Sequence, residues 1–307
     1  MVDATLRSNA SGWPACRIPV LNVRAMLLVC CLLFFGAGAG ALEITDDRGV
    51  RVTIAGVPAR IVSVYPSLTE MVCQLGQCQR LVGVDRYSNF PESVRKLPRV
   101  GGGMDPSVEA IVALRPDLVL LATSSPVPAR LESLGLVVLA FEPKRYADVR
   151  RVLDQLGRVL DAGPQAQQAW RAIESGVAAA AQSLPPSARG KRVYFEVNAA
   201  PYAAGESSFI GETLQRLGLA NIVPAPLGPF PRINPEFVVR ADPDLIMIGD
   251  ASFTGMVQRP GWARMRAIAE KRVCVFDPAQ ADVMVRAGPR IAEAAHAMAR
   301  CVISHLP

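Results

Sequence analysis

The chain has 307 residues, of which 50% are hydrophobic and 20% charged, with 24 Gly and 25 Pro. This composition is typical of a folded globular protein and excludes a disordered chain, a collagen and a coiled coil. The formal net charge is +6, but basic and acidic residues are interspersed, so no basic patch predicts binding to nucleic acid or to a membrane surface. At roughly 150 residues per domain, the length predicts about two lobes, each able to bury a core without metals or disulfides.

An apolar run near the N-terminus predicts a secretory signal peptide. Residues 25–35 form this run, with Arg17 and Arg24 before it and the small residues 36–41 after it. Its eleven residues fall well short of the roughly 20 that a membrane-spanning helix needs. We expect cleavage after residue 41 and a periplasmic mature protein, with an uncleaved anchor as the alternative. Translation begins at either Met1 or Met26.

The seven cysteines divide at this cleavage site. Four remain in the mature chain: Cys73, Cys78, Cys274 and Cys301. An even number in an oxidising compartment favours disulfides over buried thiols, and three connectivities are open. A bridge between Cys73 and Cys78 is sterically feasible because Gly76 lies between them and a helix can turn back there. Cys274 would then pair with Cys301.

Strand-like and helical runs alternate after a short polar start at residues 43–49. The expected strands of the first half are residues 60–65, 81–84, 117–122 and 137–141. The expected helices are residues 68–75, 108–114 and 129–134. This alternation predicts a mostly parallel sheet covered on both faces.

An Ala- and Gln-rich stretch, residues 163–184, interrupts the alternation and has no turn signal before Pro185. A helix of about 20 residues spans about 30 Å, which suits a rigid connector, although an ordinary packed helix is the alternative. The alternation then resumes, with strands at 192–197, 245–249 and 272–276 and helices at 209–217, 235–240 and 289–303.

The expected fold is therefore α/β, with two Rossmann-like lobes that have mostly parallel central sheets and are joined by one long helix. The domain boundaries we expect are a signal peptide at 1–41, an N-terminal lobe at 42–162, a linking helix at 163–186 and a C-terminal lobe at 187–307.

One internal repeat supports two related lobes. Residues 108–120 align without gaps on residues 235–247, and both segments read Glu, a helical turn or two, Pro-Asp and then a buried strand. The repeat places Glu109 and Glu236 at equivalent surface positions. Two related lobes around one connector form a cleft, where small molecules usually bind.

A search for catalytic motifs finds no nucleophile elbow, P-loop, dinucleotide fingerprint or histidine metal motif in the sequence. We therefore predict a binding protein and no enzyme. Zinc is disfavoured because the histidines, His296 and His305, sit near the C-terminus and not beside a cysteine pair. A metal-inserting chelatase on the same scaffold is the alternative of another class, and it needs a His and carboxylate pair in the cleft.

Loops between the expected strands and helices carry aromatic and polar residues suited to a large flat ligand. Rings supply apolar area by stacking, and an Asp with an Arg can fix the ligand's orientation. For Phe90 and Phe230, packing in the core is an equal alternative. The loops are residues 65–67, 87–90, 201–202 and 229–231, together with Asp282 and Arg286.

These segments carry a resemblance to a known family. The patterns at residues 60–70, 82–88, 109–119 and 286–291 resemble the periplasmic cobalamin-binding proteins of bacterial ABC importers, over nearly the whole mature chain. That helix-linked class also contains haem-, siderophore- and metal-binding members. The resemblance implies a corrinoid held edge-on in the cleft, little hinge closure, no cofactor beyond the transported ligand, a protein that is monomeric when free, and a permease dimer in the inner membrane as partner.

The resemblance also implies roles for individual residues. Two surface acids, Glu109 and Glu236, match the acids that meet arginines of the permease, one on each lobe. For a single glutamate in a first helical turn, stabilisation of the helix dipole is the ordinary role, and it is the symmetric pair that favours docking. The cleft positions of the family are matched by Pro66, Tyr87, Tyr202, Phe230, Asp282 and Arg286.

The sequence departs from the family pattern where two cleft tryptophans stand as Gly103 and Ala122, which reduces the stacking area. A free metal ion is disfavoured as cargo because the cleft loops carry no histidine. Haem or a ferric siderophore is the alternative ligand within the class, and haem would take an axial phenol from Tyr87, Tyr65 or Tyr202.

Overall fold

The computed structural model describes Met1 and residues 41–198, 201–249, 255–256 and 258–306. The described residues from 41 onward form one compact unit. Nearly all of the predicted signal peptide lies outside the described residues. Within the described ranges, no helix is both long enough and apolar enough to cross a membrane.

The first half of the compact unit is built on a four-stranded parallel sheet in the order β4-β3-β5-β6. Val62, Val119 and Val138 on one face pack with the α3 and α4 side chains Ile111 and Leu131. Helices α2 and α5 pack on the opposite face. The strands are β3 (Ile61–Ser63), β4 (Leu81–Val84), β5 (Leu118–Leu121) and β6 (Val138–Ala140), and the helices are α2 (Pro66–Gln74), α3 (Val108–Ala113), α4 (Pro128–Ser133) and α5 (Tyr146–Val159).

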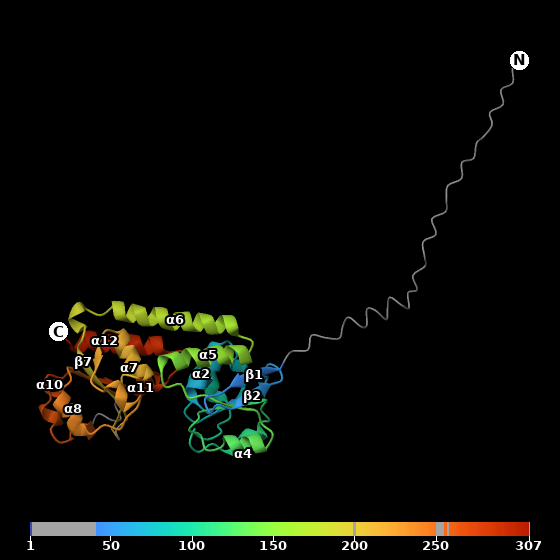
Figure 1. Cartoon of the computed structure of the whole chain (residues 1–307), viewed down its shortest axis with the longest axis horizontal. Coiled ribbons are helices and arrows are strands. Elements are labelled where there is room, and N and C mark those ends of the chain that lie inside the picture. Colours follow the sequence, from blue (N-terminus) through green and yellow to red (C-terminus); the bar gives the residue numbers. More distant parts are fainter. Residues whose placement is uncertain (2–40, 199–200, 250–254, 257, 307) are drawn as a thin grey trace. The chain divides into compact units, whose positions relative to one another are not determined.

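The second half contains a five-stranded sheet in the order β11-β10-β7-β8, with β9 also paired to β7. All pairs are parallel except β7 with β8. The strands are β7 (Arg192–Asn198), β8 (Tyr202–Ala203), β9 (Ala220–Asn221), β10 (Leu245–Gly249) and β11 (Val273–Phe276). The helices are α7 (Phe209–Arg216), α8 (Pro235–Ala241), α10 (Arg266–Ala269), α11 (Pro278–Val285) and α12 (Ile291–His305), as labelled in Figure 1.

The predicted fold class is confirmed, and the predicted strands and helices match the structure to within a few residues at their ends. Several elements were missed. The polar start forms an antiparallel hairpin of β1 (Leu42–Thr45) and β2 (Arg51–Ile54), which buries Ile44 and Ile54. Helix α5 was missed because its apolar residues are spaced three and four apart among charged ones and form no continuous run. Helices α10 and α11, strands β8 and β9, and short 3-10 turns at 78–80, 92–96, 186–188, 225–227 and 262–264 were also not predicted.

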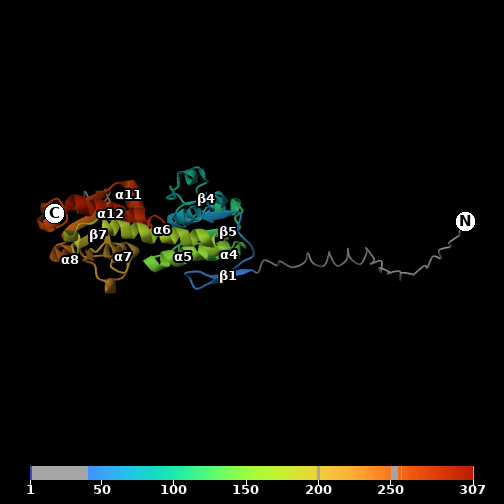
Figure 2. The ribbon, with the colours of Figure 1, turned by 90° about the horizontal axis from the view of Figure 1, so that it is seen from above.

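Helix α6 (Gly163–Gln182) joins the two halves and is also a packed helix, so both interpretations of the Ala-rich stretch hold. It buries Trp170, Ile173 and Val177 and contacts α5 of the first half and α12 of the second, along which it runs in Figure 1. Figure 2 shows it from above, between α5 and α12. A Cβ on Gly176 would lie 2.6 Å from the Cβ of Ala292, so glycine is what allows α6 and α12 to approach.

One hydrophobic cluster runs through both halves. It includes Leu118 and Leu120 from the first sheet and Leu245 and Met247 from the second, with side chains of α5, α6, α7 and α12 between them. Opening the two halves would separate part of this common core from its neighbours, which costs free energy in proportion to the apolar area exposed. The shared core therefore favours a nearly fixed relation between the two halves.

The internal repeat is also a repeat of contacts. At the end of α3 and of α8, Arg115 and Asp242 both have a left-handed backbone, with φ of 45° and 41°. In the first half Arg60 donates to the carbonyls of Leu114 and Arg115. The equivalent Arg192 donates to the carbonyls of Ala241 and Asp242. In both halves, an arginine at the start of a central strand thus donates hydrogen bonds to the carbonyls at the C-terminal end of a helix, which is α3 in the first half and α8 in the second.

Candidate functional site

The candidate site is formed where the loops after β3 and β4 meet the segment between α11 and α12. In parallel sheets, ligands usually bind at the carboxyl ends of the strands, and the β3 and β4 loops lie there. The two halves are in contact at this point, since a Cβ on Gly288 would lie at van der Waals distance, 3.5 Å, from the Cβ of Ser67 at the start of α2.

A buried carboxylate from α2 anchors the site. Glu70 is 2% exposed, and its Oε1 accepts hydrogen bonds from Arg286 Nη1 at 2.8 Å and from Arg290 Nη2 at 2.7 Å. Its Oε2 accepts from Arg290 Nε at 3.0 Å. Burial alone would lower the pKa of Arg290, but hydrogen bonds and charge from Glu70 outweigh it and raise the pKa. One carboxylate of the first half therefore binds two arginines of the second.

Arg286 extends this anchor to the loop after β4. Its Nη1 also donates to Asn89 Oδ1 at 2.8 Å, and its Nη2 donates to the Tyr87 carbonyl at 3.0 Å. Asp282 pairs with Arg286 at 2.8 Å and accepts from Asn89 Nδ2 at 2.7 Å. Arg286 is only 8% exposed, and its guanidinium is engaged by protein groups, so it fixes the shape of the loop.

A row of buried hydroxyl groups supports the loop after β4 from the protein interior. Ser88 Oγ lies 2.9 Å from Thr69 Oγ1, and Thr69 Oγ1 lies 2.8 Å from Ser63 Oγ, both within hydrogen-bond distance. Asp85 accepts from the Tyr87 N–H at 2.7 Å and from the Ser88 hydroxyl. Burial raises the pKa of the Asp85 carboxyl, although these hydrogen bonds and the charge of Arg286 act in the opposite direction.

The supported loop presents two aromatic rings. Tyr87 is 60% exposed and Phe90 is 44% exposed. The Arg290 guanidinium lies 4.1 Å from the centre of the Phe90 ring, within the range of a cation–π contact. The Arg86 guanidinium lies farther from the Tyr87 ring, 5.8 Å from its centre. Tyr87 is thus the more exposed of the two rings, on a backbone held by Asp85 and Arg286.

Tyr202 and Phe230 form a second group in the C-terminal half. The backbone of Tyr202 on β8 forms an isolated antiparallel β-bridge with that of Arg232. Next to it, the N–H of Ala203 donates to the Pro231 carbonyl at 3.0 Å. The Phe230 ring is half-buried and meets Phe209 edge-on at 6.0 Å, whereas Tyr202 is 39% exposed. The structure brings Tyr87 and Asp282 together through Arg286.

Pro66 begins α2 directly after Tyr65. Burial, together with the charge of Glu142, raises the pKa of Tyr65 to about 12. A phenol with a raised pKa is a poor source of the phenolate that an iron ligand requires, which counts against Tyr65 as an axial ligand.

Glu109 and Glu236 are both exposed and both stand second in their helices, α3 and α8. Ser107 caps α3 and Asn234 caps α8 through a side-chain oxygen. The equivalent surface positions expected from the repeat are therefore equivalent in local structure as well.

Glu70, Asn89 and Arg290 belong to the centre of the site, yet the sequence analysis assigned no role to Glu70 or Arg290 and included Asn89 only within the loop 87–90. All three lie inside or beside the motifs that carry the resemblance, which was the available signal. Burial was the missing information, because a buried Glu with two Arg partners 216 and 220 residues away has no signature in local spacing.

The four cysteines pair as Cys73 with Cys78 and Cys274 with Cys301, with Cα atoms 4.1 and 5.9 Å apart. One expectation needs correction. His305 does lie beside a cysteine pair, because its Nδ1 is 3.8 Å from Cys274 Sγ. The sequence signal was the spacing of four between Cys301 and His305, which puts them on one face of a helix.

Residues 61–280 match the family described as periplasmic binding protein. A relative in Bacillus subtilis, named an uncharacterized ABC transporter substrate-binding lipoprotein, is 28% identical over 272 residues and covers 85% of each chain. A vitamin B12-binding protein of Yersinia pestis is 29% identical over 194 residues, which is 62% of this chain and 69% of the relative.

Solved structures show the same fold. A periplasmic heme binding protein from Pseudomonas aeruginosa is 28% identical, with a TM-score of 0.67, and the match covers 81% of this chain and 93% of that one. The similarity thus extends over both sheets and the helix between them.

Proposed function

Because the chain belongs to the periplasmic binding protein family, we propose that it captures cobalamin or a related corrinoid between its two halves and delivers it to an ABC transporter permease. The vitamin B12-binding relative of Yersinia pestis supports this ligand class. The family consists of solute-binding proteins, and the protein performs no chemical turnover. The mature chain acts in the periplasm, freed from its leader by cleavage, and is a monomer when unbound.

The observation that carries the proposal is the locked loop after β4, with an exposed Tyr87 ring on a backbone held by Arg286. A pre-formed aromatic surface binds a flat ligand without paying an ordering entropy on binding. The large shared core and the Glu70 anchor keep this surface in place, so the ligand binds to a site that already has its shape.

The charges of the site favour a corrinoid over haem. Haem carries two carboxylates at its edge, which need cationic partners, whereas the rim of a corrinoid carries amides. The two arginines at the site are already paired with Glu70 and Asp282. Asp282 and Asn89 remain half-buried and offer the mixed acceptors and donors that amides require.

Substitution of the exposed rings tests the binding surface. Tyr87→Ala and Tyr202→Ala should each lower the affinity for cyanocobalamin by about 10- to 100-fold, the range of about 1.4 to 2.8 kcal/mol expected for an aromatic anchor. Leu134→Ala is the matched control, because Leu134 is exposed but precedes β6 at the opposite end of the sheet. Unchanged affinity in both tyrosine variants would contradict the proposed surface.

Haem is the second candidate, and the structure from Pseudomonas aeruginosa supports it. An axial phenolate from Tyr87 or Tyr202 would hold the iron. Haemin added to the protein would then give a shifted absorption band that Tyr87→Phe or Tyr202→Phe abolishes. A spectrum insensitive to both substitutions excludes this mode of binding.

The pair Glu109 and Glu236 is the proposed docking point for the permease. Replacing both with Ala should leave ligand affinity unchanged and stop uptake, because neither carboxylate belongs to the ligand site. Glu43→Ala is the control, since Glu43 is an exposed glutamate on the hairpin. Normal uptake by the double variant would refute the docking role.

A further inference from the structure

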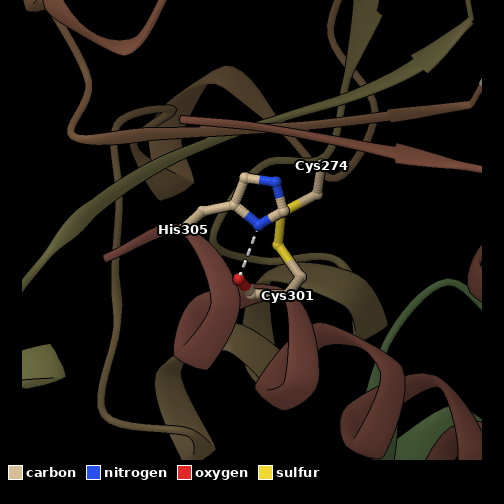
Figure 3. Close-up of side chains that lie close together, drawn as sticks. All are labelled: Cys274, Cys301 and His305. Carbon is tan, nitrogen blue, oxygen red and sulfur yellow. Dashed lines mark hydrogen bonds between the residues drawn. A yellow bond between two sulfur atoms is a disulfide. The ribbon is translucent and has the colours of Figure 1, made fainter. Parts of the chain in front are cut away.

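The C-terminal end of α12 places three metal-ligating side chains together, far in sequence from the loops after β3 and β4. Cys301 and His305 lie one turn apart on α12, and Cys274 faces them from β11 (Figure 3). Their ligand atoms all lie within 4.8 Å of one another, and no other group of three such residues occurs in the part of the chain that the structure describes. Both sulfurs are buried and the histidine is half-buried.

His305 presents its Nδ1 to the cysteine pair, with Nδ1 3.8 Å from Cys274 Sγ. The same Nδ1 lies 3.0 Å from the Cys301 carbonyl, which can only accept, so in the oxidised state Nδ1 carries a proton and donates it in this hydrogen bond. Figure 3 shows this hydrogen bond, with the ring beside the disulfide.

The spacing suits a zinc ion once the sulfurs are separate. Tetrahedral zinc with Zn–S of about 2.3 Å and Zn–N of about 2.0 Å requires about 3.8 Å between sulfurs and about 3.6 Å between sulfur and nitrogen. The backbones are already placed for this, since the Cα atoms of Cys274 and Cys301 are 5.9 Å apart. Side-chain rotation alone can then separate the sulfurs.

We propose that the Cys274–Cys301 pair is a redox-gated zinc site. In the oxidised state the two sulfurs are bonded to each other and cannot both donate to a metal. A dithiol reductant transfers two electrons and two protons to the disulfide, which yields two thiols and leaves the reductant as its own disulfide. Zinc then displaces both thiol protons and binds the two thiolates and Nδ1 of His305, whose imidazole keeps its one proton on Nε2 instead, and the fourth position is open to water.

The second disulfide provides an internal comparison. Cys73 and Cys78 are also paired, but the polar group beside them is the Ser93 hydroxyl, 3.6 Å from Cys78 Sγ. A hydroxyl is a weak zinc ligand, and two thiolates alone leave half of the tetrahedron unfilled. Reduction should therefore create zinc affinity at one pair and leave the other without it.

The test is a zinc titration of the mature protein before and after reduction with a phosphine, which does not compete for zinc as a dithiol does. The oxidised protein should show two disulfides by mass spectrometry and bind no zinc, and the reduced protein should bind one equivalent. Cobalt(II) should give thiolate-to-metal charge-transfer absorption in the reduced protein only. Reduced protein that binds no zinc would overturn the proposal.

Variants locate the site. The Cys73→Ser, Cys78→Ser double variant should retain the full equivalent, and His305→Gln should weaken binding by at least about tenfold, the lower limit seen even for outer-shell partners. His296→Gln, on the same helix, is the matched control and should bind like the wild type. His305→Gln leaves both disulfides intact, so its folding is verified by oxidised-state thermal unfolding. Equal zinc affinity of the His305→Gln and His296→Gln variants would refute the site.

Discussion

The substitution Glu70→Gln tests the anchor between the two halves. It replaces a carboxylate that accepts three hydrogen bonds from two arginines with an amide that keeps one acceptor oxygen and places a donor against a guanidinium. The positive charges of Arg286 and Arg290 would then lack the carboxylate that now lies between them. Water cannot replace it, because both arginine side chains are at most 15% exposed. Removing one partner of a buried pair costs about 3–5 kcal/mol.

That loss should lower the midpoint of thermal unfolding by on the order of 10 °C for a chain of this length, measured by circular dichroism and repeated in urea. The matched control is Asp154→Asn, because the pair of Asp154 with Arg150 spans 3.9 Å between side chains that are 47% and 61% exposed. Exposed pairs contribute about 0.2–1 kcal/mol, so this variant should unfold near the wild type. If Glu70→Gln unfolds within about 2 °C of Asp154→Asn, the anchor does not stabilise the fold.

Two further predictions concern the packing of α6 against α12 and the titration of Asp85. Gly176→Val should destabilise the protein by about 1–3 kcal/mol through overpacking against Ala292, and adding Ala292→Gly should recover part of the lost stability. Urea unfolding measures the stability of both variants. A Gly176→Val variant as stable as the wild type would contradict the close approach of α6 and α12. Burial raises the pKa of Asp85 above its ordinary 3.8, so the native state binds more protons than the unfolded state and Asp85 loses stabilising effect as the pH rises through its folded pKa. Asp85→Asn should therefore gain stability relative to the wild type between acid and neutral pH, and a pH-independent difference in unfolding free energy would refute the assignment.

Much of the fold was predictable because its strands are continuous apolar runs and its helices are flanked by Pro and Gly. β4 and β10 were predicted with the bounds that the structure gives them, since both are buried stretches that end at clear turns. Helix α5 and the β1–β2 hairpin escaped because their apolar residues alternate with charged ones, and a few buried side chains in a polar segment resemble a loop.

The site was predictable in part for a different reason. The loops at the strand ends were found from their aromatic residues, and Tyr87 is indeed exposed there. Glu70 was not assigned, because its role depends on Arg286 and Arg290 from the other half of the chain. The proximity of His305 to Cys274 comes from the packing of α12 against β11, and its one local signal was the spacing of four between Cys301 and His305.

Calorimetric titration of the mature protein with cyanocobalamin, haemin and a ferric hydroxamate tests the central claim most directly. We expect saturable binding of cyanocobalamin with one ligand per chain, and weaker or no binding of the other two. Silence with cyanocobalamin together with saturation by haemin would contradict it.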